Sequence, residues 1–202
     1  MDDKVCIPAV ILAAGASTRL GSPKQLAMLG DETLLQRAIR VAREAGCAPL
    51  IVVLGAEATR VLLDGLPDDT VPVINEQWEE GMASSIRLGV RACGIIAKGA
   101  EGVVLMTCDQ PAVTSKHLQW LMLRVEIKAS RYAGRNGVPA FFPKKSFNTL
   151  MALEGDAGAR ALLENARYEE LEGGDLDVDT EEDLARAREI VRGDVSLRDP
   201  VK

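Results

Sequence analysis

The stretch AVILAAGASTRLGSPKQL, residues 9–26, decides the fold because it joins an apolar run directly to a loop of small residues. Residues 9–12 are all apolar, which is typical of a strand that is buried on both faces. The small side chains that follow let backbone N–H groups approach phosphate oxygens, and Arg19 and Lys24 add positive charge. The segment therefore predicts a strand followed by a loop that binds a nucleoside triphosphate.

The spacing of the glycines distinguishes this loop from two common phosphate-binding motifs. Five residues separate Gly15 from Gly21, and Lys24 follows shortly after. This spacing matches neither GxGxxG nor GxxxxGK[ST], which disfavours a dinucleotide-dependent oxidoreductase. A glycine turn alone is also compatible with an ordinary connection after a strand.

Apolar runs alternate with amphipathic stretches along most of the chain. This alternation predicts a three-layer α/β architecture, with a mostly parallel central sheet and helices on both faces. In such sheets ligands bind beyond the C-terminal ends of the strands. The expected strands are 9–12, 50–54, 71–74, 103–107 and 138–142, with short extended pieces near 168–171 and 176–178. The expected helices are about 32–45, 57–65, 82–97, 115–128, 144–152, 158–165 and 181–192.

The length of 202 residues is compatible with one domain. We expect residues 1–192 to form it and residues 193–202 to be a flexible tail, because that segment has little apolar periodicity. The net charge of −6 and an aromatic content of 3% argue against nucleic acid as a partner. No apolar run is long enough to cross a membrane and no export signal is evident, so a cytoplasmic location is expected. The four cysteines lack a CxxC pair, which disfavours a zinc site.

The segment LAAGASTRLGSPKQL resembles the LAAGxSxRxGxPK signature of the molybdenum cofactor nucleotidyltransferases, the MobA-like group of NTP transferases. Three later segments resemble the same family in the same order, and together the matches cover about residues 7–192. The resemblance implies a Rossmann-like nucleotidyltransferase fold, with nucleotide binding in about 7–112 and acceptor binding in about 113–192. The later segments are NEQWEEGMASS (75–85), CDQP (108–111) and DVDTEEDL (177–184).

The resemblance is closest to the cytidylyltransferase branch, which carries LAAG and shares three further segments. These read GMASSIRLG (81–89), GVPAFF (137–142) and GDAGAR (155–160) in this chain. The implied reaction converts CTP and a molybdopterin-type cofactor into the cytosine dinucleotide form and pyrophosphate, with Mg²⁺ as cofactor. Two alternatives remain: another nucleoside triphosphate or phosphorylated acceptor, such as a sugar phosphate, and a non-catalytic nucleotide-binding partner of a molybdoenzyme. A molybdoenzyme or its chaperone is accordingly a candidate protein partner.

The nucleotide-binding residues that the resemblance implies come from the loop and from the start of the helix near residue 82. Arg19 and Lys24 would neutralise the triphosphate and act in catalysis together with Asp109, and Lys24 is expected to be an exposed loop cation. Ser85, more than Ser84, would contact the base, although a serine at a helix start is also a simple cap. The expected nucleotide-binding set is Leu12, Ala13, Ala14, Gly15, Ser17, Arg19, Lys24, Gly81, Ser84 and Ser85.

Asp109 follows a buried strand and is the expected Mg²⁺ ligand, because hard cations prefer oxygen. A second carboxylate is expected from Asp177 or Asp179. We expect only one of the two to face the site and favour Asp177, with Asp179 capping the final helix together with Thr180.

Three further residues lie outside the loop and the group of carboxylates. Arg160 of the GDAGAR segment would bind the phosphate of the acceptor. Trp78 either covers the nucleotide or fills the core, and packing is favoured. His117 lies on an expected helix face and is assigned no role.

Overall fold

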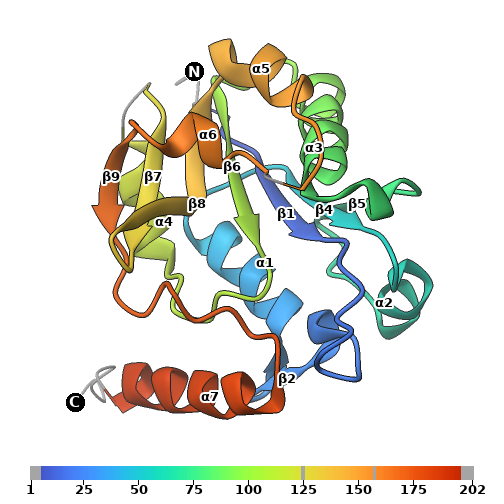
Figure 1. Ribbon diagram of the computed structural model, residues 1–202. Coiled ribbons are helices and arrows are strands. Elements are labelled where there is room, and N and C mark those ends of the chain that lie inside the picture. The colour runs from blue at the N-terminus through green and yellow to red at the C-terminus, as the bar shows by residue number, and fades with distance from the viewer. Residues whose placement is uncertain (1–5, 124–125, 157, 197–202) are drawn as a thin grey trace.

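The computed structural model describes residues 6–123, 126–156 and 158–196, with side chains up to residue 192. A seven-stranded sheet crosses the molecule in the order β5-β4-β1-β6-β8-β7-β9, and a separate two-stranded hairpin, β2-β3, precedes the first helix (Figure 1). The seven strands are β1 (Ala9–Ala13), β4 (Leu50–Leu54), β5 (Thr70–Ile74), β6 (Gly102–Thr107), β7 (Lys128–Tyr132), β8 (Arg135–Pro143) and β9 (Arg167–Glu170); the hairpin strands are β2 (Met28–Leu29) and β3 (Glu32–Thr33).

The sheet is mostly parallel. Strand β1 pairs in parallel with β4 and β6, β4 with β5, and β7 with β9, whereas β8 runs antiparallel to both β6 and β7. Because β8 runs against its neighbours, it begins at the sheet edge where β6 ends. The chain thus brings the start of a late strand to the carboxyl ends of the early ones.

Helices cover both faces of the sheet (Figure 1). Those on one face are α1 (Leu34–Glu44), α2 (Ala58–Asp64) and α4 (Ser115–Met122), and those on the other are α3 (Met82–Ile96), α5 (Phe147–Met151) and α6 (Arg160–Leu163). Three 3-10 turns, η1 (Lys24–Leu26), η2 (Trp78–Glu80) and η3 (Lys144–Ser146), and the final helix α7 (Glu181–Ser196) complete the described chain.

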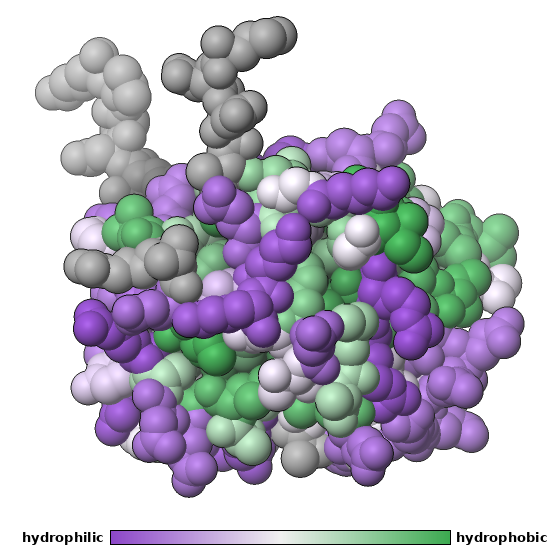
Figure 2. All heavy atoms as spheres, turned by 90° about the horizontal axis from the view of Figure 1, so that it is seen from above, coloured by the Kyte–Doolittle hydropathy of each residue, from purple (hydrophilic) through white to green (hydrophobic). Residues whose placement is uncertain are grey.

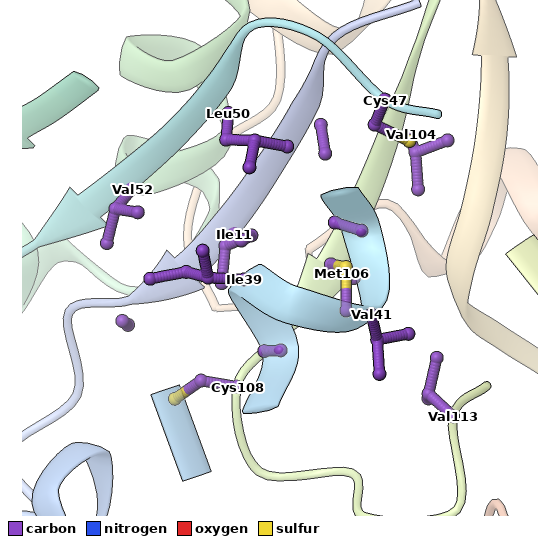
Figure 3. Packing of buried hydrophobic residues seen from close by; sticks show 14 of the residues in the cluster. Ile11, Ile39, Val41, Cys47, Leu50, Val52, Val104, Met106, Cys108 and Val113 are labelled. Carbon is purple, nitrogen blue, oxygen red and sulfur yellow. The ribbon is translucent and has the colours of Figure 1, made fainter. Parts of the chain in front are cut away.

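Side chains of β1 contribute to a hydrophobic core on each face of the sheet, because successive side chains of a strand point to opposite faces. Ile11 packs on the face of α1, where Figure 3 shows it next to Ile39, and Val10 packs on the face of α3. Gly89 of α3 lies directly over Val10, and a Cβ there would collide with that valine. Glycine therefore lets α3 pack closely onto β1.

Local capping fixes where α1 begins. The Thr33 hydroxyl accepts a hydrogen bond from Gln36 N, and the Gln36 side chain accepts one from Thr33 N, so the helix starts with a capping box. Helix α7 lies beside the β2–β3 hairpin and the start of α1 rather than over the sheet (Figure 1). Its apolar side chains share a small core with Leu29, Leu34 and Val178.

The expected α/β fold with a mostly parallel sheet is confirmed. One local expectation was wrong. The helix expected to reach residue 128 ends at Met122, and strand β7, which was not expected, begins at Lys128, where polar residues obscure the strand pattern. The extended piece expected at 176–178 joins no strand of the sheet, and α7 continues to Ser196, which lies within the segment 193–202. Residues 197–202 lie outside the described part.

The surface is mixed in polarity. On the face in Figure 2, purple hydrophilic side chains alternate with smaller green hydrophobic groups. Within residues 6–123, 126–156 and 158–196, no helix is long and apolar enough to cross a membrane.

The only histidine of the chain, His117, is buried between α4 and the sheet. The Ser130 hydroxyl donates to Pro139 O at 2.6 Å, so His117 Nε2, 2.8 Å from Ser130 Oγ, is the donor in that contact. Burial lowers the pKa of His117 to about 4. The folded protein therefore keeps this imidazole neutral at pH values where the unfolded chain protonates it.

This difference predicts a pH-dependent stability with a defined sign. Stability from neutral His117 is complete above its unfolded pKa of about 6.5 and is lost as the pH falls toward about 4, by up to ~1.4 kcal/mol per pH unit. Urea unfolding between about pH 7 and about pH 5 should show a shallower pH slope for His117→Gln than for the parent. The exposed neighbour variant Lys116→Gln should keep the parental slope, and identical slopes in all three proteins would contradict this account.

Candidate active site

The site lies at the carboxyl ends of β1 and β6. Strands β4 and β5 lie on one side of β1, and β6 lies on the other side. The direction in which successive strands are added to the sheet therefore reverses between β1 and β6. Open α/β sheets bind ligands in the crevice at this kind of switch point.

Two cavities meet there. The first, of about 560 Å³, extends from the loop after β1 to Trp78 and Ser85, and the second, of about 200 Å³, extends to the start of β8. Both are lined by Met82, Thr107, Asp109 and Asp156. Asp109 therefore stands where molecules bound in the two cavities would meet.

Gln25 shapes the loop after β1. Its fully buried Nε2 donates to Ala13 O at 2.8 Å and Gly15 O at 2.9 Å, and its Oε1 accepts from the Ser17 hydroxyl at 3.4 Å. The Ser17 hydroxyl also accepts from Lys24 N at 3.0 Å. These bonds close the loop on itself.

Ser17 has a φ of 54°, in the left-handed region that a non-glycine residue rarely adopts. Strained residues of this kind persist where neighbouring contacts hold them, and they concentrate at ligand sites. Here the two hydrogen bonds to the Ser17 hydroxyl supply that restraint. Of the expected nucleotide-binding residues of this loop, the first cavity is lined by Leu12, Ala13, Ala14, Gly15 and Lys24.

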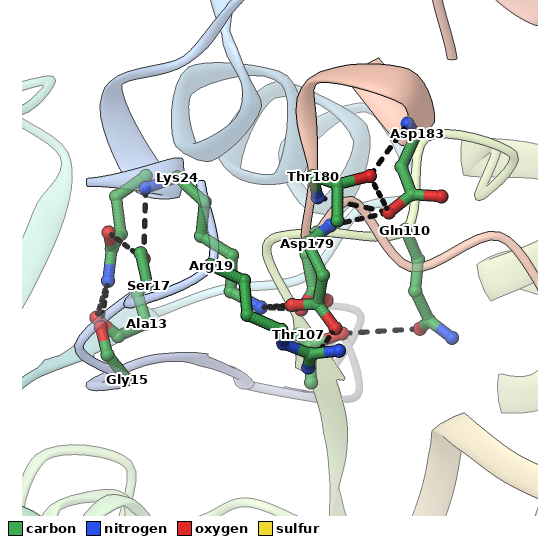
Figure 4. A network of polar contacts seen from close by, with 12 residues as sticks. Ala13, Gly15, Ser17, Arg19, Lys24, Thr107, Gln110, Asp179, Thr180 and Asp183 are labelled. Carbon is green, nitrogen blue, oxygen red and sulfur yellow. Dashed lines mark hydrogen bonds and ion pairs between the residues drawn. The ribbon is translucent and has the colours of Figure 1, made fainter. Parts of the chain in front are cut away.

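Lys24 binds two carboxylates that are far apart in the sequence. Its Nζ lies 2.6 Å from Asp109 Oδ2 and 2.9 Å from Asp179 Oδ1, and Arg19 binds the other oxygen of Asp179 at 2.6 Å (Figure 4). The Lys24 side chain is only 17% exposed, whereas that of Arg19 is 72% exposed. The expectation of an exposed Lys24 was therefore wrong, because the lysine turns inward to the two aspartates.

The charged groups of this cluster shift one another's pKa values strongly. Burial would lower the pKa of Lys24, but the charge of Asp109 and the hydrogen bonds to Asp109 and Asp179 raise it well above its ordinary value. The pKa of Asp177 is raised to about 6 by partial desolvation and by the nearby negative charges of Asp109 and Asp179. The three aspartates thus form one negative region with Lys24 inside it.

Both late aspartates lie at the site, contrary to the expectation that only one faces it. Val178 between them is buried, and its N–H donates to Asp109 O at 2.9 Å. Residues two apart in an extended segment point to the same side, so Asp177 lines the second cavity while Asp179 binds Lys24. Thr180, not Asp179, caps α7, since its hydroxyl accepts from Asp183 N.

Asn75 organises the start of α3. Its buried Nδ2 donates to Ser84 Oγ at 2.8 Å and Ser85 Oγ at 2.9 Å. The Ser84 hydroxyl also donates to Gly81 O at 2.8 Å, so Ser84 stabilises the helix start. Ser85 and Gly81 line the first cavity and Ser84 does not.

Gln25, Asn75 and Asp156 were missed as site residues. Asp156 Oδ1 accepts from Met82 N at 3.3 Å at the start of α3, and Gly155 O accepts from Ala83 N. All three lie within the segments that carry the family resemblance. The side chains of Gln25 and Asn75 are uncharged, so they do not stand out in the sequence as binding residues. The sequence also does not indicate which group Asp156 contacts.

The cluster fits a divalent cation. Asp109 Oδ1 is buried and has no hydrogen-bond partner among the described residues, while Oδ2 is held by Lys24. A carboxylate oxygen left free at a cavity wall is a suitable ligand for Mg²⁺ or Mn²⁺. Within the same part of the chain no group of three or more His, Cys, Asp or Glu side chains forms a complete metal cage. Such an ion would therefore need further oxygens, which a bound triphosphate supplies.

The fold and the loop of this site define an α/β nucleotidyltransferase. The model of the MobA-like NTP transferase domain matches residues 9–171, and the chain belongs to that family. Two curated relatives are matched over most of their length. The purine catabolism protein PucB of Bacillus subtilis is 29% identical over 89% of this chain and 94% of its own, and the nicotine blue oxidoreductase of Paenarthrobacter nicotinovorans is 30% identical over 80% and 83%.

Further similarity comes from a molybdenum cofactor enzyme and from solved structures. The molybdenum cofactor guanylyltransferase of Sinorhizobium fredii is 35% identical over 52% of this chain and 46% of its own. The crystal structure of Rv0371c from Mycobacterium tuberculosis H37Rv has a TM-score of 0.75 at 36% identity and covers 92% of this chain and 99% of its own. A structure of that protein in complex with manganese has a TM-score of 0.75 at 34% identity, covering 92% and 98%.

The position of Lys24 predicts a dual effect of its removal. In Lys24→Ala the two aspartates lose their shared cation, so the melting temperature should fall and kcat/KM should fall about ten- to a hundredfold. Added Mg²⁺ should raise the melting temperature of the variant more than that of the parent, because it can neutralise the same carboxylates. The control Lys98→Ala, at an exposed lysine, should match the parent in both measurements. A Lys24→Ala protein with parental melting and turnover would rule out the role of Lys24.

Proposed function

We propose that this nucleotidyltransferase transfers CMP from CTP to a molybdopterin-type cofactor and releases pyrophosphate. The observation that carries the proposal is the placement of Lys24 and Asp109 at the junction of the two cavities. The first cavity would hold the nucleotide on the loop after β1, and the second would hold the acceptor. The family resemblance and the guanylyltransferase relative support the acceptor class.

The reaction is a displacement at the α-phosphorus of the nucleotide. An anionic oxygen of the acceptor phosphate forms the new P–O bond, and the bond to pyrophosphate breaks. Because the attacking oxygen is already an anion, no side chain has to remove a proton. His117 accordingly lies in the core and lines neither cavity.

Positioning and charge neutralisation would therefore supply the rate enhancement. In this mechanism Lys24 leaves the aspartates and stabilises the charge that develops on the leaving pyrophosphate, and Arg19 acts with it from the exposed side of the loop. Backbone N–H groups of the loop, whose shape Gln25 fixes, would hold the phosphates.

Asp109 and one late aspartate would anchor a divalent cation. When bound, such an ion neutralises phosphate oxygens and polarises the reacting centre. The sharing of Lys24 between Asp109 and Asp179 favours Asp179 as the second anchor, while Asp177, the residue favoured by the sequence, lies close enough for its pKa to respond to Asp109. The manganese complex of the Mycobacterium tuberculosis relative is consistent with the binding of a divalent cation.

A second candidate function comes from the relative named nicotine blue oxidoreductase. An oxidoreductase would bind a nicotinamide or flavin dinucleotide in the same crevice. The loop lacks the GxGxxG spacing that such cofactors commonly use, so we place this function second.

One assay distinguishes these functions. The protein is incubated with Mg²⁺, molybdopterin and each of the four labelled nucleoside triphosphates, and the products are identified. We expect pyrophosphate and a cytosine dinucleotide from CTP, with slower turnover of GTP. Equal turnover of both would remove the cytidylyl assignment. Oxidation of NADH with a dye acceptor, without nucleotidyl product, would favour the oxidoreductase instead.

A comparison of aspartate variants tests the metal anchors. Mn²⁺ titrations followed by electron paramagnetic resonance should show affinity reduced about tenfold or more in Asp109→Asn and Asp179→Asn, because a charged ligand is lost, and reduced less in Asp177→Asn. Asp175→Asn, an exposed position in the same segment, serves as the control. Parental Mn²⁺ affinity and turnover of Asp109→Asn at limiting metal would refute the metal role of Asp109.

A further inference from the structure

Two arginines line the second cavity opposite the aspartates. Arg135 stands at the start of β8 and Arg160 at the start of α6, and neither has an ion-pair partner among the described residues. Arg131 on the same hairpin is different, because it pairs with Glu170 at 3.6 Å and stacks on Tyr168 at 4.4 Å. Arg135 and Arg160 are thus positive groups beside a cavity that Asp109, Asp156 and Asp177 also line, and neither arginine forms an ion pair with these aspartates.

The hairpin that carries Arg135 is geometrically defined. Ala133 and Gly134 have φ values of 48° and 74°, and positive φ at both central residues is the signature of the tight turn that fits the twist of paired strands. Tyr132 before the turn donates its hydroxyl to Val138 O at 3.0 Å, across the hairpin. Arg135 is therefore presented from a fixed backbone.

Asn136 supplies an independent observation. Its Nδ2 donates to Leu163 O at 2.8 Å and Ala166 O at 3.2 Å, while its Oδ1 is buried without a hydrogen-bond partner among the described residues. Both partners of the nitrogen are carbonyl oxygens, so the amide cannot be reversed and Oδ1 can only accept. A buried acceptor without a partner is costly. Because Asn136 lines the second cavity, a donor in a bound ligand would satisfy it.

The space beyond the second cavity sets the size of this ligand. An adjoining outer cavity of about 510 Å³ is also lined by Arg135, Asn136 and Arg160. The second cavity, at about 200 Å³, has room for a phosphate group with a short linker, and the outer cavity has room for a larger body. Arg135, Asn136 and Arg160 thus lie between the space for the phosphate group and the space for the larger body of the ligand.

We propose that Arg135 and Arg160 bind the phosphate of the acceptor and that Asn136 Oδ1 accepts a hydrogen bond from an N–H or O–H group of the acceptor body. This inference rests on the proposed function and narrows the acceptor to phosphomonoesters that carry such a donor near the phosphate. Arg135 and Asn136 are then specificity-determining residues, and a phosphomonoester with a purely apolar body is a poor substrate.

The anion part is tested by calorimetric titration of inorganic phosphate, with α,β-methylene CTP and Mg²⁺ present to occupy the nucleotide cavity. Arg135→Gln and Arg160→Gln should each weaken phosphate binding about tenfold or more, because a charge-assisted contact is lost. The control Arg167→Gln should stay within about twofold of the parent, since that arginine pairs with Glu126 and lines neither cavity. Parental phosphate affinity of Arg135→Gln, or an equal loss in Arg167→Gln, would overturn the subsite.

The donor part is tested with Asn136→Ala. The KM for molybdopterin should rise about tenfold or more, while the affinity for inorganic phosphate and the KM for CTP stay near the parent. A merely structural role of Asn136 would change all three values together, and that result, or an unchanged KM for molybdopterin, would overturn the assignment. Melting curves check that the variant is folded.

These measurements separate two kinds of failure. If no cytidylyl product forms with any acceptor but Arg135→Gln selectively loses phosphate binding, the proposed function fails and the anion subsite stands. If the product forms and Arg135→Gln keeps the parental KM for the acceptor, the function stands and the subsite is overturned.

Discussion

The ammonium group of Lys24 lies between Asp109 and Asp179 and holds together three segments that are far apart in the sequence. The loop after β1, the end of β6 and the segment before α7 all meet at this cation. The small core under α7 depends on the same contact between segments. Val178, which precedes Asp179, packs into this core, and its N–H donates a hydrogen bond to the backbone carbonyl of Asp109. One buried charge thus connects the loop after β1 to the last helix.

This contact also explains why the loop can be both strained and defined. The hydroxyl of Ser17 receives the N–H of Lys24, and the next residue, Gln25, binds the carbonyls of Ala13 and Gly15. The inward turn of Lys24 therefore fixes the direction of the backbone that would face phosphate. A preorganised loop of this kind needs little rearrangement when its ligand binds.

The sequence predicted the sheet and the loop because both depend on local patterns. Strand β1 is continuously apolar and ends in small residues, and Asp109 follows an equally apolar β6. Strand β7 was missed because the residues Lys128–Tyr132 are largely polar and gain their partners only from β8 and β9. The roles of Gln25 and Asn75 were missed for a related reason, since an amide becomes structural only through neighbours that folding supplies.

Because β8 runs antiparallel to its neighbours, the two sides of the cleft are built from different parts of the sequence. The side proposed to bind the nucleotide is built from the loop after β1 and the helix after η2, whereas the opposite wall is one short hairpin and the start of α6. A change of a few residues in that hairpin can alter the wall without disturbing the loop or its lysine. Divergence of acceptors within one scaffold is then structurally simple. This arrangement offers a physical reason why chains of this family carry names as different as purine catabolism protein and molybdenum cofactor guanylyltransferase.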